Sequence, residues 1–270
     1  MSQKATVKED STSVQVGGNL TVGLSFENCE RIFNLLLLEN MPKLEAIAQE
    51  KAVENVHELV RLTYQKLDDR VEKIELKKIS EPDVQSTFNT AVQGVAKKGE
   101  KIDIDLLANL LQSRLESEND DYIDNCIELA VEIIPKLTNE LLSVIPIIHF
   151  IQSMSISDQN QLNQALISLD KLYLSKCSEI SFNKLKTIAS TGAGELITIN
   201  DSYAVAKLKN RYSMVYANVD GKFQGAIKVL ITYEKLKLYK LTLTTSGEVI
   251  AIKMLEKIFG EISLKNFLIN

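Results

Sequence analysis

The chain has 270 residues, of which 45% are apolar and 25% charged, and its formal net charge is −5, as expected for a globular protein. The three cysteines, Cys29, Cys126 and Cys177, are far apart and form no CxxC pair, which argues against a disulfide framework. No N-terminal stretch combines basic residues, an apolar core and a cleavage site, so the sequence excludes a secretion signal and predicts a cytoplasmic protein.

The N-terminal segment differs in composition from the rest of the chain. Residues 1–13 are polar and small without periodicity, which predicts a flexible tail. Residues 11–25, STSVQVGGNLTVGLS, are uncharged, free of proline and rich in β-branched residues. Such composition favours extended backbone that pairs with other strands. We therefore expect residues 1–24 to form a β-prone segment outside the helical body.

Helices are expected from about residue 25. Ser25 is a candidate N-cap for a helix over 26–39, and Pro42 begins a second helix that continues to residue 78. One apolar stripe follows that second helix and resembles the seam of a bundle or coiled coil, packed either within the chain or across a dimer. The stripe residues we expect at this helical interface are Leu44, Ile47, Val56, Leu59, Val60 and Leu67.

Short polar connections and capping residues mark further helices up to residue 190. Ser80 with Asp83 resembles a capping box, and Asp103 and Ser181 are candidate caps of later helices. Residues 141–154, LLSVIPIIHFIQSM, are shorter than the roughly 20 residues needed to cross a bilayer, so they predict a buried helix and no membrane span.

The composition changes at residues 190–200, STGAGELITIN, and we interpret this segment as the boundary between the helical domain and the C-terminal part. Beyond it we expect helix, strand, helix, strand, with Ser246 capping the second helix and EISLKNFLI forming the last strand. The pattern around Thr242 and Gly247 weakly resembles the closing strand and helix of winged-helix modules. The fold class predicted is mainly α: a β-prone segment (1–24), a helical domain (25–190) and a small α+β part (191–270).

No residue pattern predicts a catalytic, cofactor or metal site. His57 and His149 have no neighbouring ligands at metal-binding spacing. The glycines of STGAGEL lack the lysine and the spacing of a phosphate-binding loop, and the acidic run 116–124 lacks EF-hand spacing. We therefore expect no enzyme and no cofactor, and interpret the acidic run as a solvated turn.

Four residues of the N-terminal segment carry a family resemblance. Val14, Gln15, Val16 and Gly17 match the V/I-Q-V/I-G tetrad and resemble the core of the RIP homotypic interaction motif, an amyloid-forming element of immune signalling proteins; Asn19 extends the match. The usual downstream tyrosine is missing. The wider opening also resembles an uncharacterised group of bacterial proteins associated with defence against phage. The resemblance implies homotypic contact, whereas an edge strand, a hairpin and an idle tail remain alternatives.

These observations favour a non-enzymatic interaction or assembly protein. It would self-associate through the VQVG segment and its helices, with an effector or signalling protein as a further partner in bacterial immune signalling. The alternative is a nucleic-acid-associated regulator, because residues 201–270 carry 11 basic against 6 acidic residues. Those basic residues are scattered rather than clustered, which favours an ordinary solvated face over DNA contact.

Overall fold

The computed structural model describes residues 26–40, 46–116, 119–177, 180–217, 221 and 223–268. Helices dominate this part of the chain, with one two-stranded sheet, so the predicted mainly α fold is confirmed. The segment 1–24, with Val14, Gln15, Val16, Gly17 and Asn19, lies outside the described residues. The same holds for Leu44.

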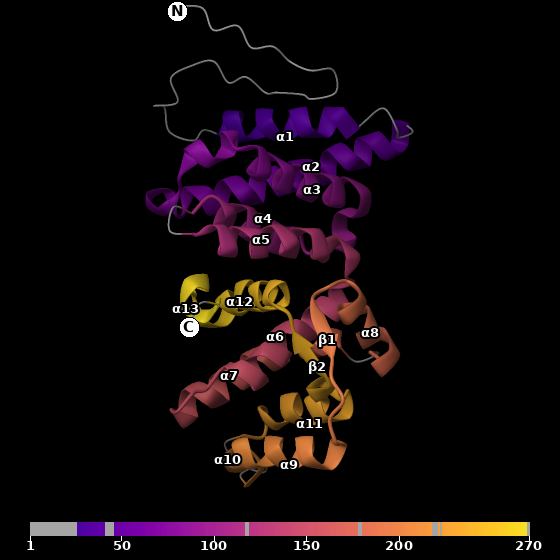
Figure 1. Ribbon diagram of the computed structural model, residues 1–270, viewed down its shortest axis with the longest axis vertical. Helices are drawn as coiled ribbons and strands as arrows, with labels where there is room; N and C mark the ends of the chain where they lie inside the picture. The colour runs from indigo at the N-terminus through magenta and orange to yellow at the C-terminus, as the bar shows by residue number, and fades with distance from the viewer. Residues whose placement is uncertain are drawn as a thin grey trace, which may run out of the picture.

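The helices of the first half stack at one end of the molecule (Figure 1). Helix α1 is the outermost, and it packs on α2 and α3, which in turn contact α4 and α5. The bounds of these helices are α1 Phe26–Asn40, α2 Ala46–Asp68, α3 Pro82–Lys98, α4 Ile104–Arg114 and α5 Asp121–Ile133.

The second half continues from this stack to the other end of the molecule (Figure 1). Helix α12 lies between the two halves and contacts α4, α5 and α6. The elements are α6 Asn139–Ser153, α7 Gln159–Leu172, α8 Phe182–Ser190, β1 Gly194–Leu196, α9 Asp201–Arg211, α10 Ser213–Ala217, α11 Ile227–Lys235, β2 Leu241–Leu243, α12 Thr245–Phe259 and α13 Leu264–Leu268.

Short 3-10 helices join several of these elements: η2 Val71–Lys73, η3 Leu76–Ser80, η4 Gly99–Lys101, η5 Ile134–Lys136, η6 Leu174–Lys176 and η7 Leu238–Lys240. The strands β1 and β2 pair antiparallel, with Gly194 opposite Leu243 and Leu196 opposite Leu241. Buried side chains from both halves form one hydrophobic cluster. Residues before and after the boundary at 190–200 therefore share a core.

The second helix is shorter than predicted. It ends at Asp68 instead of continuing to residue 78, and the 3-10 turns η2 (71–73) and η3 (76–80) follow. The backbone N–H of Glu75 donates to the carbonyl oxygen of Leu115 at 2.8 Å, so a tertiary contact takes the place of a helical hydrogen bond. This contact holds the turns against the chain that follows α4.

Helix capping was predicted correctly in two places and wrongly in two others. Asp103 accepts a hydrogen bond from the N–H of Leu106 at 2.9 Å, and Ser181 accepts from that of Lys184 at 3.3 Å, as expected of N-caps. Ser80 does not cap α3, because Glu81 is its N-cap and Pro82 its first residue. Thr244, not Ser246, caps α12.

Of two further predicted elements, one is confirmed and the other is wrong. The apolar run 141–154 falls in the buried helix α6, as predicted. The last strand is wrong: EISLKNFLI contains helix α13, of which Leu264 is buried and which packs on α12 and α5. A strand there would need a neighbouring strand edge, and α13 instead completes the apolar cover of two helices.

Candidate functional site

The apolar stripe predicted as a helical interface is buried inside the chain. Val56, Leu59, Val60 and Leu67 are at most 1% exposed, and α2 packs on α1, α3 and α4. Ile47 is the second residue of α2, but its side chain lies outside the described atoms. The intramolecular alternative therefore holds for the four described residues, which leave no surface for a second copy.

Helix α1, unlike the buried stripe of α2, has exposed apolar side chains. Its sequence contains four consecutive leucines, residues 35–38. Successive residues of a helix are about 100° apart, so four in a row cannot all face one core. Leu37 is 4% exposed and packs inward, whereas Leu35 is 41% and Leu38 is 61% exposed. The outer face of α1 thus presents two leucines three residues apart.

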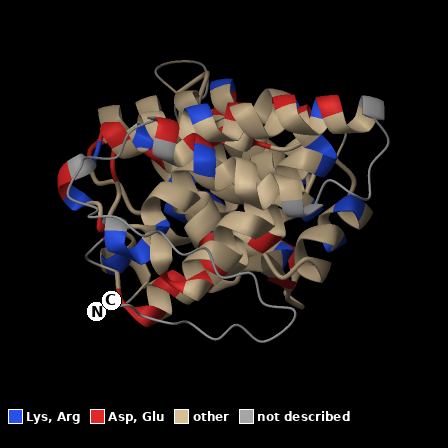
Figure 2. Cartoon of the chain, turned by 90° about the horizontal axis from the view of Figure 1, so that it is seen from above, with Lys and Arg blue, Asp and Glu red and all other residues tan. Residues whose placement is uncertain are grey.

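Charged and polar side chains surround these leucines. Together they line a shallow hollow on the outer side of the helix. We call this set the α1 face: Glu27, Glu30, Arg31, Asn34, Leu35 and Leu38. Figure 2, which looks down on this end of the molecule, shows acidic and basic residues interspersed. A surface with both signs of charge around an apolar centre is suited to contact a copy of itself.

The cysteine thiols are buried. Burial raises the pKa of Cys29 to about 11 and that of Cys177 to about 12, and it also raises that of Cys126. These thiols are therefore protonated at neutral pH, and the thiolate is the reactive form. In the described part of the chain, no cluster of three or more metal-binding side chains is present.

His149 is a buried titratable group without a hydrogen-bond partner. It is 3% exposed on α6, neither ring nitrogen has a hydrogen-bond partner, and Glu248 of α12 lies 3.9 Å from Nδ1. Burial lowers the pKa of His149 to about 4 and raises that of Glu248, so the imidazole is neutral at pH 7.

We expect this histidine to make the protein sensitive to acid. Below about pH 6.5 the imidazole of His149 is protonated in the unfolded chain, whereas in the folded chain it stays neutral down to about pH 4. Stability should therefore be full above pH 6.5 and fall by about 3 kcal/mol toward pH 4. Urea denaturation across this range measures the slope. His149→Leu should flatten it and His57→Leu, at an exposed site, should not; a slope that survives His149→Leu refutes the assignment.

Part of the acidic run 116–124 is a buried ion-pair network rather than a solvated turn. Arg114 is 2% exposed, and its guanidinium pairs with Asp124 at 2.6 Å and with Asp83. Lys78 also pairs with Asp124, at 3.3 Å, and donates to the backbone oxygen of Glu116. A buried cation needs such partners because desolvation is costly. The network fixes η3 and α3 to α4 and α5.

A second network joins the two halves. Lys253 of α12 is 2% exposed and pairs with Glu256 at 2.8 Å, while the Asn109 amide of α4 donates to the other Glu256 oxygen at 3.0 Å. Arg70 lies 3.7 Å from Glu256 and 3.2 Å from Glu116. We see no reacting geometry here, and these contacts explain how α12 is held on the first half.

Several basic residues of the C-terminal part are already paired. Lys237 and Lys240 both contact Asp201, at 2.8 and 2.6 Å, and Lys228 lies 3.8 Å from Asp170. Arg211 donates to the backbone oxygens of Gln152 and Met154. These pairs lower the number of cations free to contact phosphates, which disfavours the nucleic-acid alternative.

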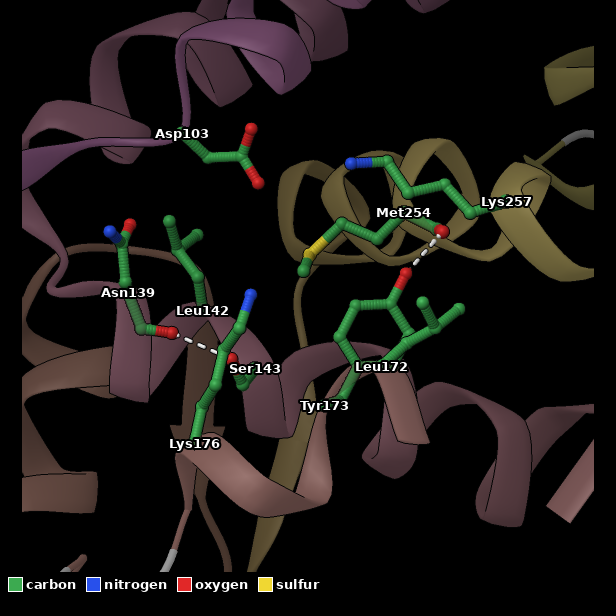
Figure 3. A pocket seen from close by; sticks show the side chains of 9 residues that line it. All are labelled: Asp103, Asn139, Leu142, Ser143, Leu172, Tyr173, Lys176, Met254 and Lys257. Atoms are coloured by element: carbon green, nitrogen blue, oxygen red, sulfur yellow. Dashed lines mark hydrogen bonds between the residues drawn. The ribbon is translucent and has the colours of Figure 1, made fainter. Parts of the chain in front are cut away.

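One pocket lies where the two halves meet, and its volume is about 130 Å³ (Figure 3). We call it the interhelical pocket; Leu142, Ser143, Leu172, Tyr173 and Met254 form its floor, and Asp103, Asn139, Lys176 and Lys257 its mouth. The Tyr173 hydroxyl donates to the backbone oxygen of Met254 at 2.5 Å. Ser143 donates to that of Asn139 at 2.7 Å.

The sequence reasoning missed both surfaces. The α1 face had a readable signal, the run of four leucines, whereas the pocket residues come from α6, α7, η6, α12 and the N-cap of α4 and share no motif. None of the helices in the described ranges has the length and apolarity needed to cross a membrane.

Residues 23–223 match the model of an uncharacterised protein family whose description reads only ":-like" and specifies no activity. The match spans most of the helices, from α1 to α10. Neither the curated proteins nor the solved structures contain a significant match to the chain.

Proposed function

The chain belongs to the uncharacterised family whose model matches residues 23–223, and we propose that it is a non-enzymatic assembly protein whose copies associate through the α1 face. The N-terminal VQVG segment adds a second homotypic contact. The observation that carries the proposal is the exposure of Leu35 and Leu38, 41% and 61%, on the outermost helix.

The geometry of α1 suits a symmetric pair. Two copies that meet with α1 antiparallel about Leu35 place Leu38 of each copy near Arg31 of the other, because equivalent positions lie on one face three to four residues apart. The aliphatic stem of Arg31 covers apolar surface while its guanidinium reaches the acidic residues Glu27 and Glu30. Burial of the leucines supplies the driving force, and the charges set the orientation.

The N-terminal segment enters the proposal through its place in the chain. Residues 11–25 directly precede α1, so pairing of two α1 faces brings two such segments together at high effective concentration. Valines that interdigitate and glutamine amides that stack are the contacts a VQVG zipper needs. An assembly of this kind fits a signalling scaffold that gathers an effector protein, the role that the family resemblance of the tetrad implies.

We expect Leu35→Glu to reduce the molar mass measured by light scattering to that of a monomer, with unchanged helical circular dichroism, because it places a carboxylate of each copy at the pair axis, where the two charges repel each other and oppose burial. Leu129→Glu is the matched control, since Leu129 is 50% exposed on α5, away from α1. Alanines at Val14, Gln15, Val16 and Gly17 should leave the pair intact and abolish larger assemblies. A wild type that is monomeric at every concentration, or a Leu35→Glu variant of wild-type mass, contradicts the proposal.

A further inference from the structure

We propose that the exposed edge of strand β1 pairs with the N-terminal segment, residues 11–25, of a neighbouring copy, which becomes a third strand of the sheet. We call this surface the β1 edge; it consists of Glu195, Leu196, Ile197 and Thr198. The inference rests on the proposed assembly function, because it gives the VQVG segment of that assembly its first partner strand. The two-stranded sheet lies in the second half of the molecule (Figure 1).

The sheet has one edge that a helix engages and one that is exposed. Helix α6 packs on β2, and the side-chain amide of Gln152 donates to the backbone oxygen of Leu241 at 2.9 Å. Helix α8 contacts β1, where Gly194 is buried, but the four residues of the β1 edge are exposed, Leu196 at 42% and Ile197 at 40%. An exposed strand edge is a template for a further strand, and a sheet of two strands is only marginally stable alone.

The backbone of Leu196 points away from β2. The N–H of Ile197 donates to the oxygen of Lys240 at 2.9 Å, and that of Thr244 donates to the oxygen of Ala193 at 3.2 Å. In an antiparallel pair, alternate residues bond to the same neighbour, so the odd-numbered residues of β1 bond to β2. The N–H and C=O of Leu196 therefore lie on the outer side, where an added strand forms main-chain hydrogen bonds.

The N-terminal segment has the composition that this edge accepts. Residues 11–25 are uncharged and contain no proline, so they bring no like charge to Glu195 and keep every main-chain N–H. A register with Val16 opposite Leu196 places these two apolar side chains on one face of the sheet. Gln15 then lies on the same face as Glu195, and its amide is a donor suited to that carboxylate.

The length of chain before α1 favours a neighbouring copy over the same chain. The eight residues 18–25, between the tetrad and Phe26, span at most roughly 30 Å when fully extended. Two further layers of helices, α2 with α3 and α4 with α5, lie between α1 and the sheet (Figure 1), followed by α12, which contacts β2. Because packed helices are about 8 to 10 Å apart, the sheet lies roughly 30 to 40 Å from α1. A segment that paired with its own β1 would have no slack.

This contact joins unlike surfaces of two copies. Each α1 pair has two N-terminal segments and two β1 edges, so the contact links one pair to the next and yields larger assemblies. One added strand is a small interface and binds weakly. The two segments of a pair act together at high effective concentration, which is why separated copies should stay monomeric.

Hydrogen exchange at single amides tests the pairing. The full chain with alanines at residues 14–17 serves as receptor, because its own segment no longer competes. A saturating peptide of residues 11–19, STSVQVGGN, should slow exchange at the N–H of Leu196 at least tenfold and leave that of Ile197, already bonded to β2, nearly unchanged. The control peptide STSAAAAGN should protect neither amide.

Two results of this measurement contradict the proposal. The first is an exchange rate of Leu196 that does not respond to STSVQVGGN. The second is protection of Leu196 that rises with protein concentration in the absence of peptide, which would assign the β1 edge to the β1 of a second copy.

Leu196→Pro tests whether the contact is made by the main chain. Proline removes the outward N–H and none of the bonds to β2, and edge strands tolerate it, so helical circular dichroism and melting should be unchanged. Binding of labelled STSVQVGGN, measured by fluorescence anisotropy, should weaken at least tenfold. Leu196→Ala keeps the N–H and should weaken binding less than about fivefold.

Equal weakening by the two variants would show a side-chain contact instead of an added strand. Neither peptide measurement depends on the α1 face. A Leu35→Glu chain of wild-type mass contradicts the α1 pair alone, whereas absence of peptide binding contradicts the β1 edge alone.

Discussion

Leu59→Asp should unfold the protein rather than separate two copies of it. Leu59 is 0% exposed in the middle of α2, and the surrounding helices α1, α3 and α4 belong to the same chain. The substitution removes a large apolar side chain and buries a carboxylate without a partner, a combined loss of roughly 5 kcal/mol or more. That loss approaches the whole stability of a typical domain, about 5 to 15 kcal/mol.

Circular dichroism and thermal melting distinguish the outcomes. The unfolded variant should have lost its helical signal at 25 °C or melt far below the wild type. Lys51→Asp, which introduces the same residue at an exposed position of the same helix, should change stability by less than about 0.5 kcal/mol. A Leu59→Asp protein that stays folded but halves its mass would show that this stripe lies between copies, contrary to the packing described.

Local signals predicted much of the fold, because they depend on neighbours in sequence. Helical periodicity predicted α1 within one residue, and the caps Asp103 and Ser181 were confirmed because an N-cap needs only its own first turn. Predictions failed where a distant group decides. Asp83 does not complete a capping box because its carboxylate pairs with Arg114, which follows 31 residues later.

Distant contacts also decide the structure at the end of α2 and in the C-terminal helix α13. The apolar period of residues 71–78 favours helix, yet Glu75 and Lys78 bond to the backbone that follows α4, and that contact selects 3-10 turns. The sequence 261–269 alternates like a strand, but among the described residues no strand edge adjoins it, and Leu264 packs on helices instead. Propensity is overridden by tertiary contacts in both segments.

The two candidate surfaces, the α1 face and the interhelical pocket, also differ in how far the sequence predicts them. A reader of the sequence can infer from four consecutive leucines that one or two must face outward, although only the packing of α1 shows that these are Leu35 and Leu38. The interhelical pocket cannot be inferred, because its mouth joins Asp103, Lys176 and Lys257, which are separated by about half the chain. Their meeting depends on where α12 returns to the first half.

Gly247→Ala should cost about 4 kcal/mol of stability, a loss at the upper end for a single added methyl group. Gly247 lies in the first turn of α12, where a Cβ atom would be 1.8 Å from the backbone oxygen of Ala193. Neither side can yield easily, because Ala193 is buried and its oxygen accepts from the N–H of Thr244, the residue that caps α12. Alanine favours helix over glycine by only about 1 kcal/mol, which does not offset the overlap.

Urea denaturation of the wild type, Gly247→Ala and Gly225→Ala tests this close approach. Gly225→Ala is the matched control, since a Cβ there would meet only the Ile167 side chain, at 3.4 Å from Cγ1 and 3.7 Å from Cδ1, and the stability of this variant should change by less than about 1 kcal/mol. Because the overlap is with Ala193, the residue before β1 that accepts from Thr244, the Gly247→Ala protein should also lose hydrogen-exchange protection at Thr244 and at β2 before the helices α1 to α5 are affected. Equal stability of the two alanine variants would show that Ala193 does not lie against the first turn of α12 as closely as 1.8 Å from a Cβ at position 247.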